Sequence, residues 1–258
     1  MTTRLKSLYW QIESAMYELY ARLMRVTTAQ KTTNHDSPVI VSLTSYKPRF
    51  RKLYLTIKCL LRQSIKPNKI ILWVSYDDYR FLPENVKEMS RKNHYFEIHT
   101  CEDIRSYKKI IPSLKKFPNA HIVTADDDVF YPKNWLLYLL KELTSEKTVI
   151  THRAHEPIFV NDILMPYDSW KHNIEKQKTK IIFPTGVGGI LYSRNSLPQE
   201  TLNQEEFMNL AQSADDLWLF WMASKNNVTY KLTEKRLNIV PWINSHKGGL
   251  AEKNVEGK

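Results

Sequence analysis

The spacing of hydrophobic residues near the start of the chain follows a helical repeat. Between residues 3 and 27, apolar side chains recur every three or four positions, which is typical of an amphipathic helix. Basic residues flank this stripe, namely Arg4, Lys6, Arg22 and Arg25. The pattern suits a helix docked on the rest of the protein, a contact between two copies, or a helix lying on an anionic membrane. The polar stretch Thr27–Pro38 is predicted to be a linker.

From Val39 to Leu143, short apolar runs alternate with amphipathic segments. The expected strands are Val39–Leu43, Lys69–Val74, Tyr95–His99 and Ala120–Ala125, and the expected helices are Leu53–Arg62, Glu84–Arg91, Lys108–Lys116 and Trp135–Leu143. This alternation predicts βαβ units and therefore an α/β protein with a mainly parallel sheet flanked by helices. Beyond Val149 the alternation becomes irregular.

Composition and net charge limit the class of protein but do not identify its binding partner. The chain has 258 residues and a formal net charge of +11, which favours a negatively charged partner such as a nucleoside diphosphate, an anionic glycan, anionic lipid or nucleic acid. Its two cysteines, Cys59 and Cys101, form no close-spaced metal motif. No apolar run reaches the ~18 residues of a membrane span, and no signal peptide is recognisable. We therefore expect a cytoplasmic protein.

Three consecutive carboxylates, Asp126, Asp127 and Asp128, directly follow the apolar run Ile122–Ala125. Adjacent carboxylates repel one another, so a fold accepts them where a cation offsets their charge. A hard divalent cation such as Mg²⁺ or Mn²⁺ prefers oxygen ligands, and the carboxyl end of a strand is where α/β sheets bind ligands. The alternative is an acidic turn ahead of the helix that begins near Asn134.

Polar motifs also follow the other predicted strands. Those that could contact a ligand are Thr44, Tyr46 and Arg49 after the first strand, Asp77 and Asp78 after the second, and Arg105 and Lys108 after the third. Tyrosine can stack on a base, carboxylates can accept hydrogen bonds from a base or ribose, and the cations suit phosphate. Each motif alone also has a structural explanation as a polar loop, a helix cap or a solvated run of charge.

The second half of the chain adds three candidates. The segment Phe183–Gly189 ends in a glycine-rich loop with Gly188 and Gly189, which permits close backbone approach to a ligand or simply a bend in a strand. Asp215 and Asp216 open an apolar helix, where a carboxylate can cap the helix or act as a general base. His246 could complete a metal shell or lie free on the surface.

Taken in order, these motifs resemble the GT-A glycosyltransferases, of the kind related to glycosyltransferase family 2. The match rests on the order of six pieces, which are T-S-Y-x-P-R, Y-D-D, D-x-R-S-Y-K-K, D-D-D, F-P-T-G-V-G-G and A-D-D-L-W. It covers residues 38–246 and leaves the N-terminal helix outside. The chain departs from the pattern in having T-S-Y at the first strand end and A-D-D where many relatives have a Glu-Asp pair, which leaves the choice between Asp215 and Asp216 open.

The resemblance implies a Rossmann-like GT-A fold with residues 1–36 as helix and linker and 37–258 as the catalytic domain, divided into a nucleotide-sugar half (37–150) and an acceptor half (151–258). It implies Mn²⁺ or Mg²⁺ held by Asp126, Asp128 and His246, with Asp126 also near the ribose. The donor, linked to UDP or GDP, would contact the nucleotide-sugar residues Thr44, Tyr46, Arg49, Asp77, Asp78, Arg105, Lys108, Asp126, Asp127, Gly188 and Gly189. Asp215 and Asp216 would be the catalytic residues, with Asp215 matching the general base of inverting members and Asp216 as the alternative.

The implied reaction transfers a sugar, with inversion, to a glycan or a lipid-linked acceptor in bacterial surface polysaccharide synthesis. It involves no nucleic acid. The N-terminal helix lies outside the resemblance, and its apolar stripe with basic flanks predicts that it brings the enzyme to an anionic membrane, such as the inner face of the cell membrane, or to a partner carrying the acceptor. Three other functions remain open from the residues themselves. They are a metal-dependent nuclease or phosphotransferase, a non-catalytic nucleotide-sugar-binding module, and a nucleotidyltransferase, although the segment 43–52 lacks the glycine-rich loop that the last class needs.

Overall fold

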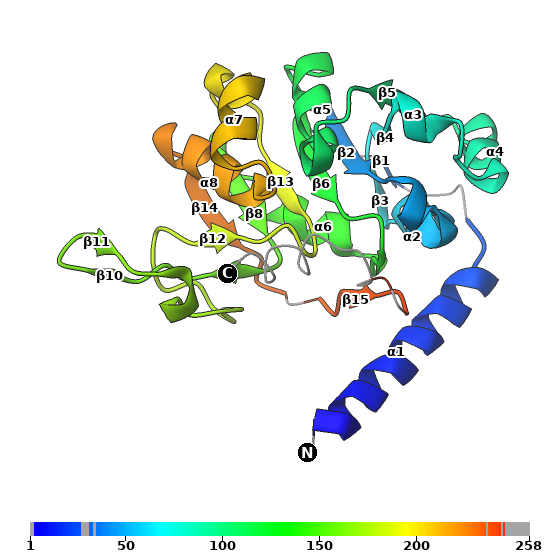
Figure 1. Cartoon of the computed structure of the whole chain (residues 1–258), viewed down its shortest axis with the longest axis horizontal. Helices are drawn as coiled ribbons and strands as arrows, with labels where there is room; N and C mark the ends of the chain where they lie inside the picture. Colours follow the sequence, from blue (N-terminus) through cyan, green and yellow to red (C-terminus); the bar gives the residue numbers. More distant parts are fainter. Residues whose placement is uncertain (1–2, 27–30, 33–34, 236, 244, 246–258) are drawn as a thin grey trace.

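A mixed seven-stranded sheet forms the centre of the protein in the computed structural model, which describes residues 3–26, 31–32, 35–235, 237–243 and 245 (Figure 1). In spatial order its strands are β14 (Thr229–Leu232), β8 (Thr148–Thr151), β13 (Ile190–Tyr192), β6 (His121–Ala125), β2 (Val39–Thr44), β4 (Lys69–Ser75) and β5 (Phe96–Cys101). Strands β6, β2, β4 and β5 are parallel, whereas β13 runs antiparallel between β6 and β8. The predicted α/β class with a mainly parallel sheet is confirmed.

Helices cover both faces of this sheet. They are α1 (Thr3–Leu23), α2 (Phe50–Leu61), α3 (Tyr76–Tyr79), α4 (Glu84–Lys92), α5 (Ile111–Lys116), α6 (Trp135–Lys141), α7 (Gln204–Leu210) and α8 (Asp215–Lys225), with 3-10 turns η1 (Lys47–Arg49), η2 (Arg105–Lys109), η3 (Tyr167–Ser169) and η4 (Gln199–Leu202). The helix predicted over Lys108–Lys116 is split into η2 and α5. Its α-helical part begins beside Pro112, because proline fits only the first turn of a helix.

Alternating side chains of the central strands feed two hydrophobic cores on opposite faces of the sheet. In β4, Ile70, Leu72 and Val74 join a core with α2, α4 and α6, while Ile71 and Trp73 join a second core with α5, α7 and α8. Because side chains point to opposite faces at successive positions, a strand buried on both faces must be apolar throughout. This explains the continuous run Lys69–Val74 that predicted the strand.

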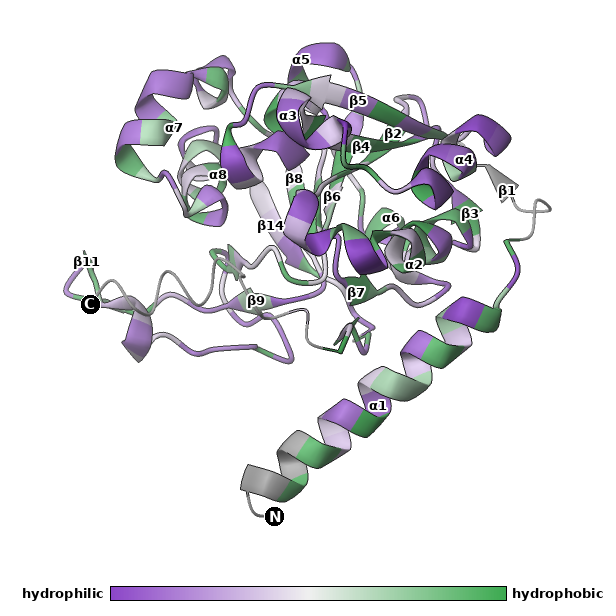
Figure 2. Ribbon diagram, turned by 45° about the vertical axis from the view of Figure 1, so that its right-hand side comes forward, coloured by the Kyte–Doolittle hydropathy of each residue, from purple (hydrophilic) through white to green (hydrophobic). Residues whose placement is uncertain are grey.

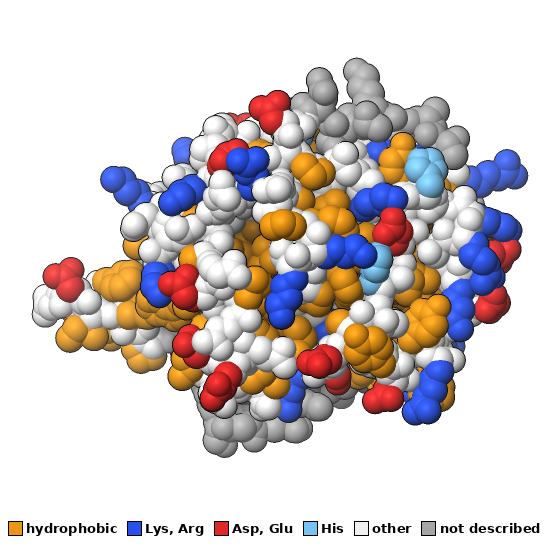
Figure 3. Space-filling view, turned by 90° about the horizontal axis from the view of Figure 1, so that it is seen from above, with side chains coloured by type: hydrophobic (Ala, Val, Ile, Leu, Met, Phe, Trp, Pro, Cys, Tyr) orange, Lys and Arg blue, Asp and Glu red, His pale blue; other side chains and the backbone are white. Residues whose placement is uncertain are grey.

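Four short strand pairs surround the main sheet. They are β1 (Lys31–Thr32) with β3 (Ile65–Lys66), β7 (Val129–Phe130) with β15 (Val240–Pro241), β9 (Ala154–His155) with β12 (Phe183–Pro184), and β10 (Phe159–Val160) with β11 (Ile163–Leu164). The predicted linker Thr27–Pro38 is described only in part and contributes β1. The β10–β11 hairpin protrudes at the left of Figures 1 and 3 and exposes Phe159, Val160 and Ile163.

Helix α1 docks on the sheet domain beside α2, β7 and β15. Ala21 and Met24 are buried in the first core, and the Tyr17 ring lies 4.5 Å from the ring of Phe130. The Ser14 hydroxyl donates a hydrogen bond to the Pro241 carbonyl at 2.6 Å. None of the helices in the described part of the chain has the length and apolar character needed to cross a membrane.

Candidate functional site

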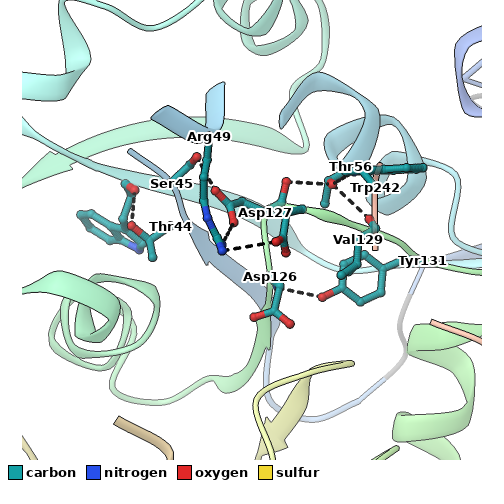
Figure 4. A network of polar contacts seen from close by, with 11 residues as sticks. Thr44, Ser45, Arg49, Thr56, Asp126, Asp127, Val129, Tyr131 and Trp242 are labelled. Carbon is teal, nitrogen blue, oxygen red and sulfur yellow. Dashed lines mark hydrogen bonds and ion pairs between the residues drawn. The ribbon is translucent and has the colours of Figure 1, made fainter. Parts of the chain in front are cut away.

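The register of the sheet brings the three aspartates after β6 beside the loop after β2. Leu43 pairs with Ala125, so the residues two positions further on, Ser45 and Asp127, are neighbours. The Ser45 hydroxyl donates to Asp127 Oδ2 at 2.5 Å (Figure 4). Arg49 donates to Asp127 Oδ1 at 2.9 Å and places its second terminal nitrogen 3.4 Å from Asp128 Oδ2. Asp127 is therefore fully engaged, and Arg49 offsets part of the negative charge of the motif.

The backbone of the same loop is held from behind by the C-terminal part of the domain. The Thr56 hydroxyl lies 3.0 Å from both the Asp127 and the Val129 carbonyl oxygens, and it accepts a hydrogen bond from the Trp242 indole at 2.8 Å. The Trp242 backbone N–H donates to the Asp128 carbonyl, also at 2.8 Å. These contacts fix where the carboxylates of the motif lie.

Asp126 and Asp128 have less compensation than Asp127. Burial and the neighbouring carboxylates raise the pKa of Asp126 to about 7, against the opposing charge of Lys109. Burial and Asp127 likewise raise the pKa of Asp128 to about 6, against Arg49. The Asp126 carboxylate points away from the Arg49 contact in Figure 4. Burial raises the pKa of Asp127 as well, although Arg49 and the Ser45 hydroxyl oppose this. A bound cation would favour the ionised form of all three largely buried carboxylates.

These two carboxylates fit the requirements of Mg²⁺ or Mn²⁺. Within the described residues, no three His, Cys, Asp or Glu side chains are grouped so that they could hold a metal ion. Mg²⁺ is commonly bound by one or two carboxylates together with substrate phosphates and water, a donor set to which Asp126 and Asp128 can contribute. The third predicted ligand, His246, lies outside the described residues.

The second acidic motif meets the first through a buried lysine. Asp215 and Asp216 open α8, and Lys109 Nζ lies 2.8 Å from Asp215 Oδ2 and 3.9 Å from Asp216 Oδ1. Burial acts to lower the pKa of Lys109, but the charges of Asp215, Asp216 and Asp126 together raise it. A permanently charged Lys109 therefore stands between two motifs that are ninety residues apart in the sequence (Asp126 and Asp216).

The two carboxylates of α8 differ in how they are held. The Asp215 side chain is 7% exposed and forms the short ion pair with Lys109, whereas that of Asp216 is 31% exposed. The Gly186 N–H donates to Asp216 Oδ2 at 2.6 Å. Burial raises the pKa of Asp216 to about 6, with Asp215 adding to the effect and Lys109 opposing it. The Asp216 side chain is the more exposed of the two and its Oδ2 is oriented by a backbone donor, while its Oδ1 is buried and has no hydrogen-bond partner among the described residues.

The glycine-rich loop packs tightly between the two acidic motifs. A Cβ on Gly186 would lie 2.8 Å from Asp216 Oδ1, and one on Gly189 would lie 2.6 Å from the Thr124 carbonyl oxygen. Gly189 also has a φ of +87°, a conformation that side chains disfavour. Gly188 accepts a hydrogen bond from the Trp135 indole at 2.6 Å. Glycine is thus required for Asp216 and the end of β6 to approach this loop.

The loops after β2 and β4 meet at Asp78, which accepts hydrogen bonds from the Ser75 hydroxyl at 2.9 Å and the Lys47 N–H at 3.2 Å. Tyr46 is half-buried, with its ring centre 6.0 Å from the Arg49 guanidinium carbon. Asp77 is exposed on α3. The Thr44 hydroxyl donates to the Trp73 carbonyl at 2.9 Å, so this predicted ligand contact also ties β2 to β4.

The two cations predicted after β5 occupy different surroundings. Arg105 is exposed and has a φ of +55°. Lys108 is buried and forms an ion pair with the exposed carboxylate of Asp103. No contact joins Lys108 to the aspartates of the two acidic motifs among the described ion pairs.

Three residues of the site were missed by sequence reasoning. Lys109 stood in the same basic motif as Arg105 and Lys108, and nothing in its spacing distinguished it from them. Ser45 was part of a hydroxyl cluster, and its partner Asp127 could be found only from the strand register. The hydroxyl of Tyr131 accepts the Asp126 N–H at 2.7 Å, a contact with no sequence signal except nearness to the motif.

Comparison with known proteins finds similar folds only among solved structures. No protein-family model and no curated protein sequence matches the chain. A mannosyltransferase from Pyrobaculum calidifontis, solved with GDP-Man and Mn²⁺, is 12% identical with a TM-score of 0.49, and the match covers 90% of this chain and 65% of that one, just under two thirds of its length. The inositol-1-phosphate CTP transferase from T. maritima is 12% identical with a TM-score of 0.47, covering 87% of this chain and 99% of that one. Both TM-scores lie below 0.5.

Proposed function

We propose that the protein is a glycosyltransferase that moves a sugar from a nucleoside-diphospho-sugar to a hydroxyl group of a glycan or lipid-linked acceptor. The observation that carries this proposal is the meeting of two acidic motifs at Lys109, at the carboxyl end of β6 and the start of α8. One motif has the donor set for a divalent cation and a diphosphate. The other offers an oriented carboxylate for proton transfer.

The donor end of the site would be built from the loops after β2, β4 and β5. Tyr46 offers a ring for a base, and Asp78 joins this loop to the one after β4. Arg105 is exposed and can turn toward a diphosphate, whereas Arg49 already contacts Asp127 and Asp128. Asp126 and Asp128 would hold Mn²⁺ or Mg²⁺, which when bound supplies positive charge beside the leaving diphosphate.

The chemistry that fits this arrangement is a single displacement. The acceptor oxygen forms a bond to the anomeric carbon while the bond from that carbon to the phosphate oxygen breaks, and the nucleoside diphosphate leaves with the bonding electrons. The proton of the acceptor hydroxyl passes to a carboxylate of α8. The exposure of Asp216 and its hydrogen bond from Gly186 support Asp216 as this base, with Asp215 and Lys109 positioning it. One displacement inverts the anomeric centre.

The released nucleotide distinguishes this function from its rivals. Glycosyl transfer releases a nucleoside diphosphate, nucleotidyl transfer from a nucleoside triphosphate and a sugar phosphate releases diphosphate, and a binding module releases neither. We would incubate the purified protein with a panel of UDP- and GDP-sugars and Mn²⁺ or Mg²⁺ and measure nucleoside diphosphate over time. Release is expected from one donor class, with loss of the activity in excess EDTA.

Two variants make this assay specific. Asp128→Asn should abolish release while leaving the protein folded, because removing one of three adjacent carboxylates relieves their repulsion. Asp36→Asn is the matched control, since Asp36 is exposed ahead of the amino end of β2, away from the carboxyl ends. Full activity in EDTA, or diphosphate as the product, would overturn the proposal.

A further inference from the structure

Helix α1 has one side docked on the protein and another whose large apolar side chains are exposed, and Figure 2 shows the helix extending away from the domain. The docked side carries Ser14, Tyr17, Glu18 and Ala21, which follow the i, i+3, i+4, i+7 pattern of one helix face. These reach Pro241, Phe130, Lys52 and the first hydrophobic core, respectively. The helix is therefore a fixed part of the molecule, and its orientation on the domain is set by these contacts.

The outward side of α1 is a continuous apolar stripe. Its residues, each at least half exposed, are Leu5, Leu8, Tyr9, Ile12, Met16, Leu19, Tyr20 and Leu23. They recur at intervals of one to four residues over the whole helix, which at 1.5 Å per residue is about 30 Å long. Contiguous exposed apolar surface of this extent marks an interaction site in a folded protein.

Among the described residues, the charged side chains that border the stripe and face outward are positive. Of the two glutamates in α1, Glu18 is engaged by Lys52 and Arg22, and Glu13 accepts a hydrogen bond from Asn238 of the domain. Arg22 borders one edge of the stripe and is half exposed. At the other edge, Arg62 of the domain donates to the Tyr20 hydroxyl at 3.0 Å.

We propose that this stripe, with its basic edges, is a docking surface for an anionic lipid bilayer. The apolar side chains would enter the boundary between headgroups and acyl chains, with Tyr9 and Tyr20 at headgroup level, and the cations would contact anionic lipids. Phe130, on which α1 packs through Tyr17, lies two residues after Asp128. Docking therefore holds the acidic motif at a fixed place relative to the membrane.

Pairing with a second copy of the chain fits the charges less well. The first turn of α1 contains no acidic residue and its last turn contains Arg22. The sequence adds Arg4 and Lys6 near the N-terminal end. Two such helices packed stripe to stripe in parallel would bring Arg22 against Arg22, whereas an anionic bilayer complements this charge.

The test uses flotation of the full-length protein with phosphatidylcholine vesicles, with and without phosphatidylglycerol. Binding is expected only with the anionic lipid. It should weaken when salt rises from about 0.1 M to about 1 M, which shortens the Debye length from about 10 Å to about 3 Å. Leu23→Glu should reduce binding by about tenfold or more, because it removes a leucine that would enter the bilayer and adds a carboxylate with the same charge as the anionic lipid.

Leu210→Glu is a closely matched control. Leu210 at the end of α7 is 75% exposed and Leu23 is 74% exposed, so the same substitution is made at equal exposure in the two places. Leu210→Glu should bind vesicles as the wild type does, and both variants should keep the wild-type melting temperature.

Three results would overturn the proposal. They are equal binding to neutral vesicles, equal loss in the two variants, or no vesicle binding together with a dimer that Leu23→Glu dissociates. Vesicle binding needs no sugar transfer, so failure of the proposed enzymatic function would leave this result unchanged.

Discussion

At the residue scale, Asp215 and Asp216 are adjacent carboxylates in unlike surroundings, and this difference can be measured. If Asp216 is the general base, Asp216→Asn should lower turnover by about 10²–10⁴-fold while donor affinity changes little. The donor contacts lie mainly in the first half of the chain, on the loops after β2, β4 and β5. Turnover and donor affinity are measured on the same preparations. Near-normal transfer by Asp216→Asn would assign the base to Asp215.

The pH dependence of the reaction tests the same assignment. Burial raises the pKa of Asp216 to about 6, and a base acts only when deprotonated. With saturating metal, which keeps Asp126 and Asp128 ionised, kcat/KM should therefore fall as the pH drops through about 6. In Asp215→Asn the neighbouring negative charge is gone. The pKa of Asp216 then falls, and the acidic limb should move to lower pH. If Asp215 were the base, its removal would abolish the limb instead of moving it.

The buried ion pair between Lys109 and Asp215 should be important for stability. Lys109→Met leaves the buried carboxylate of Asp215 without its cation, and breaking such a pair costs about 3–5 kcal/mol of unfolding free energy. The double variant Lys109→Met with Asp215→Asn should recover part of this loss. Urea unfolding of the wild type, both single variants and the double variant gives the coupling energy.

Lys108→Met is the control for this cycle. Lys108 is also buried, but its partner Asp103 is exposed and can be hydrated alone, so the cost should be smaller. Additive effects of Lys109→Met and Asp215→Asn would contradict the ion pair. The different partners of Lys108 and Lys109 could not be predicted from the sequence. They depend on the backbone turn of η2, which the residue types alone do not specify.

At the element scale, the glycine loop before β13 depends on close approach to β6. Gly189→Ala would place a Cβ 2.6 Å from the Thr124 carbonyl and at a φ of +87°, while the nearest atom to a Cβ on Gly188 is 3.5 Å away at a φ of +95°. Gly188→Ala should therefore cost about 1–2 kcal/mol from backbone strain alone. Gly189→Ala should cost more, since the carbonyl belongs to a central strand. Urea unfolding ranks the two, and equal costs would contradict the packing.

Elements of the first half could be predicted because β2, β4 and β6 are buried on both faces and the helices between them have one apolar face. The run Lys69–Val74 and the helix over Glu84–Arg91 were found for this reason, and both form with small shifts at their ends. Strand β13 could not be placed by the same means. It is three residues long and its pairing with β6 and β8 joins segments far apart in the chain.

At the scale of the whole molecule, the fold class followed from the alternation of elements, but the candidate site depends on long-range contacts. Carboxyl ends of parallel strands share one edge, so the gathering of Asp78, Arg49 and Asp127 could be anticipated. The approach of α8 to that edge could not be anticipated. It requires the antiparallel strand β13 and the glycine loop, which reverse the direction of the chain before α8 begins. The contacts that Trp242 and α1 make behind the acidic motif could not be predicted from the sequence either.

The docking of α1 makes the helix part of the folded domain, which gives a last prediction. Tyr17→Ala removes a half-buried ring 4.5 Å from Phe130 and should lower the unfolding free energy by about 2–4 kcal/mol. Tyr9→Ala makes the same change on the exposed side of the same helix, so its effect should stay within about 0.5 kcal/mol. Both are measured by urea unfolding. Equal effects would mean that α1 does not pack on the domain through Tyr17, and that the outward orientation of its apolar stripe is not fixed.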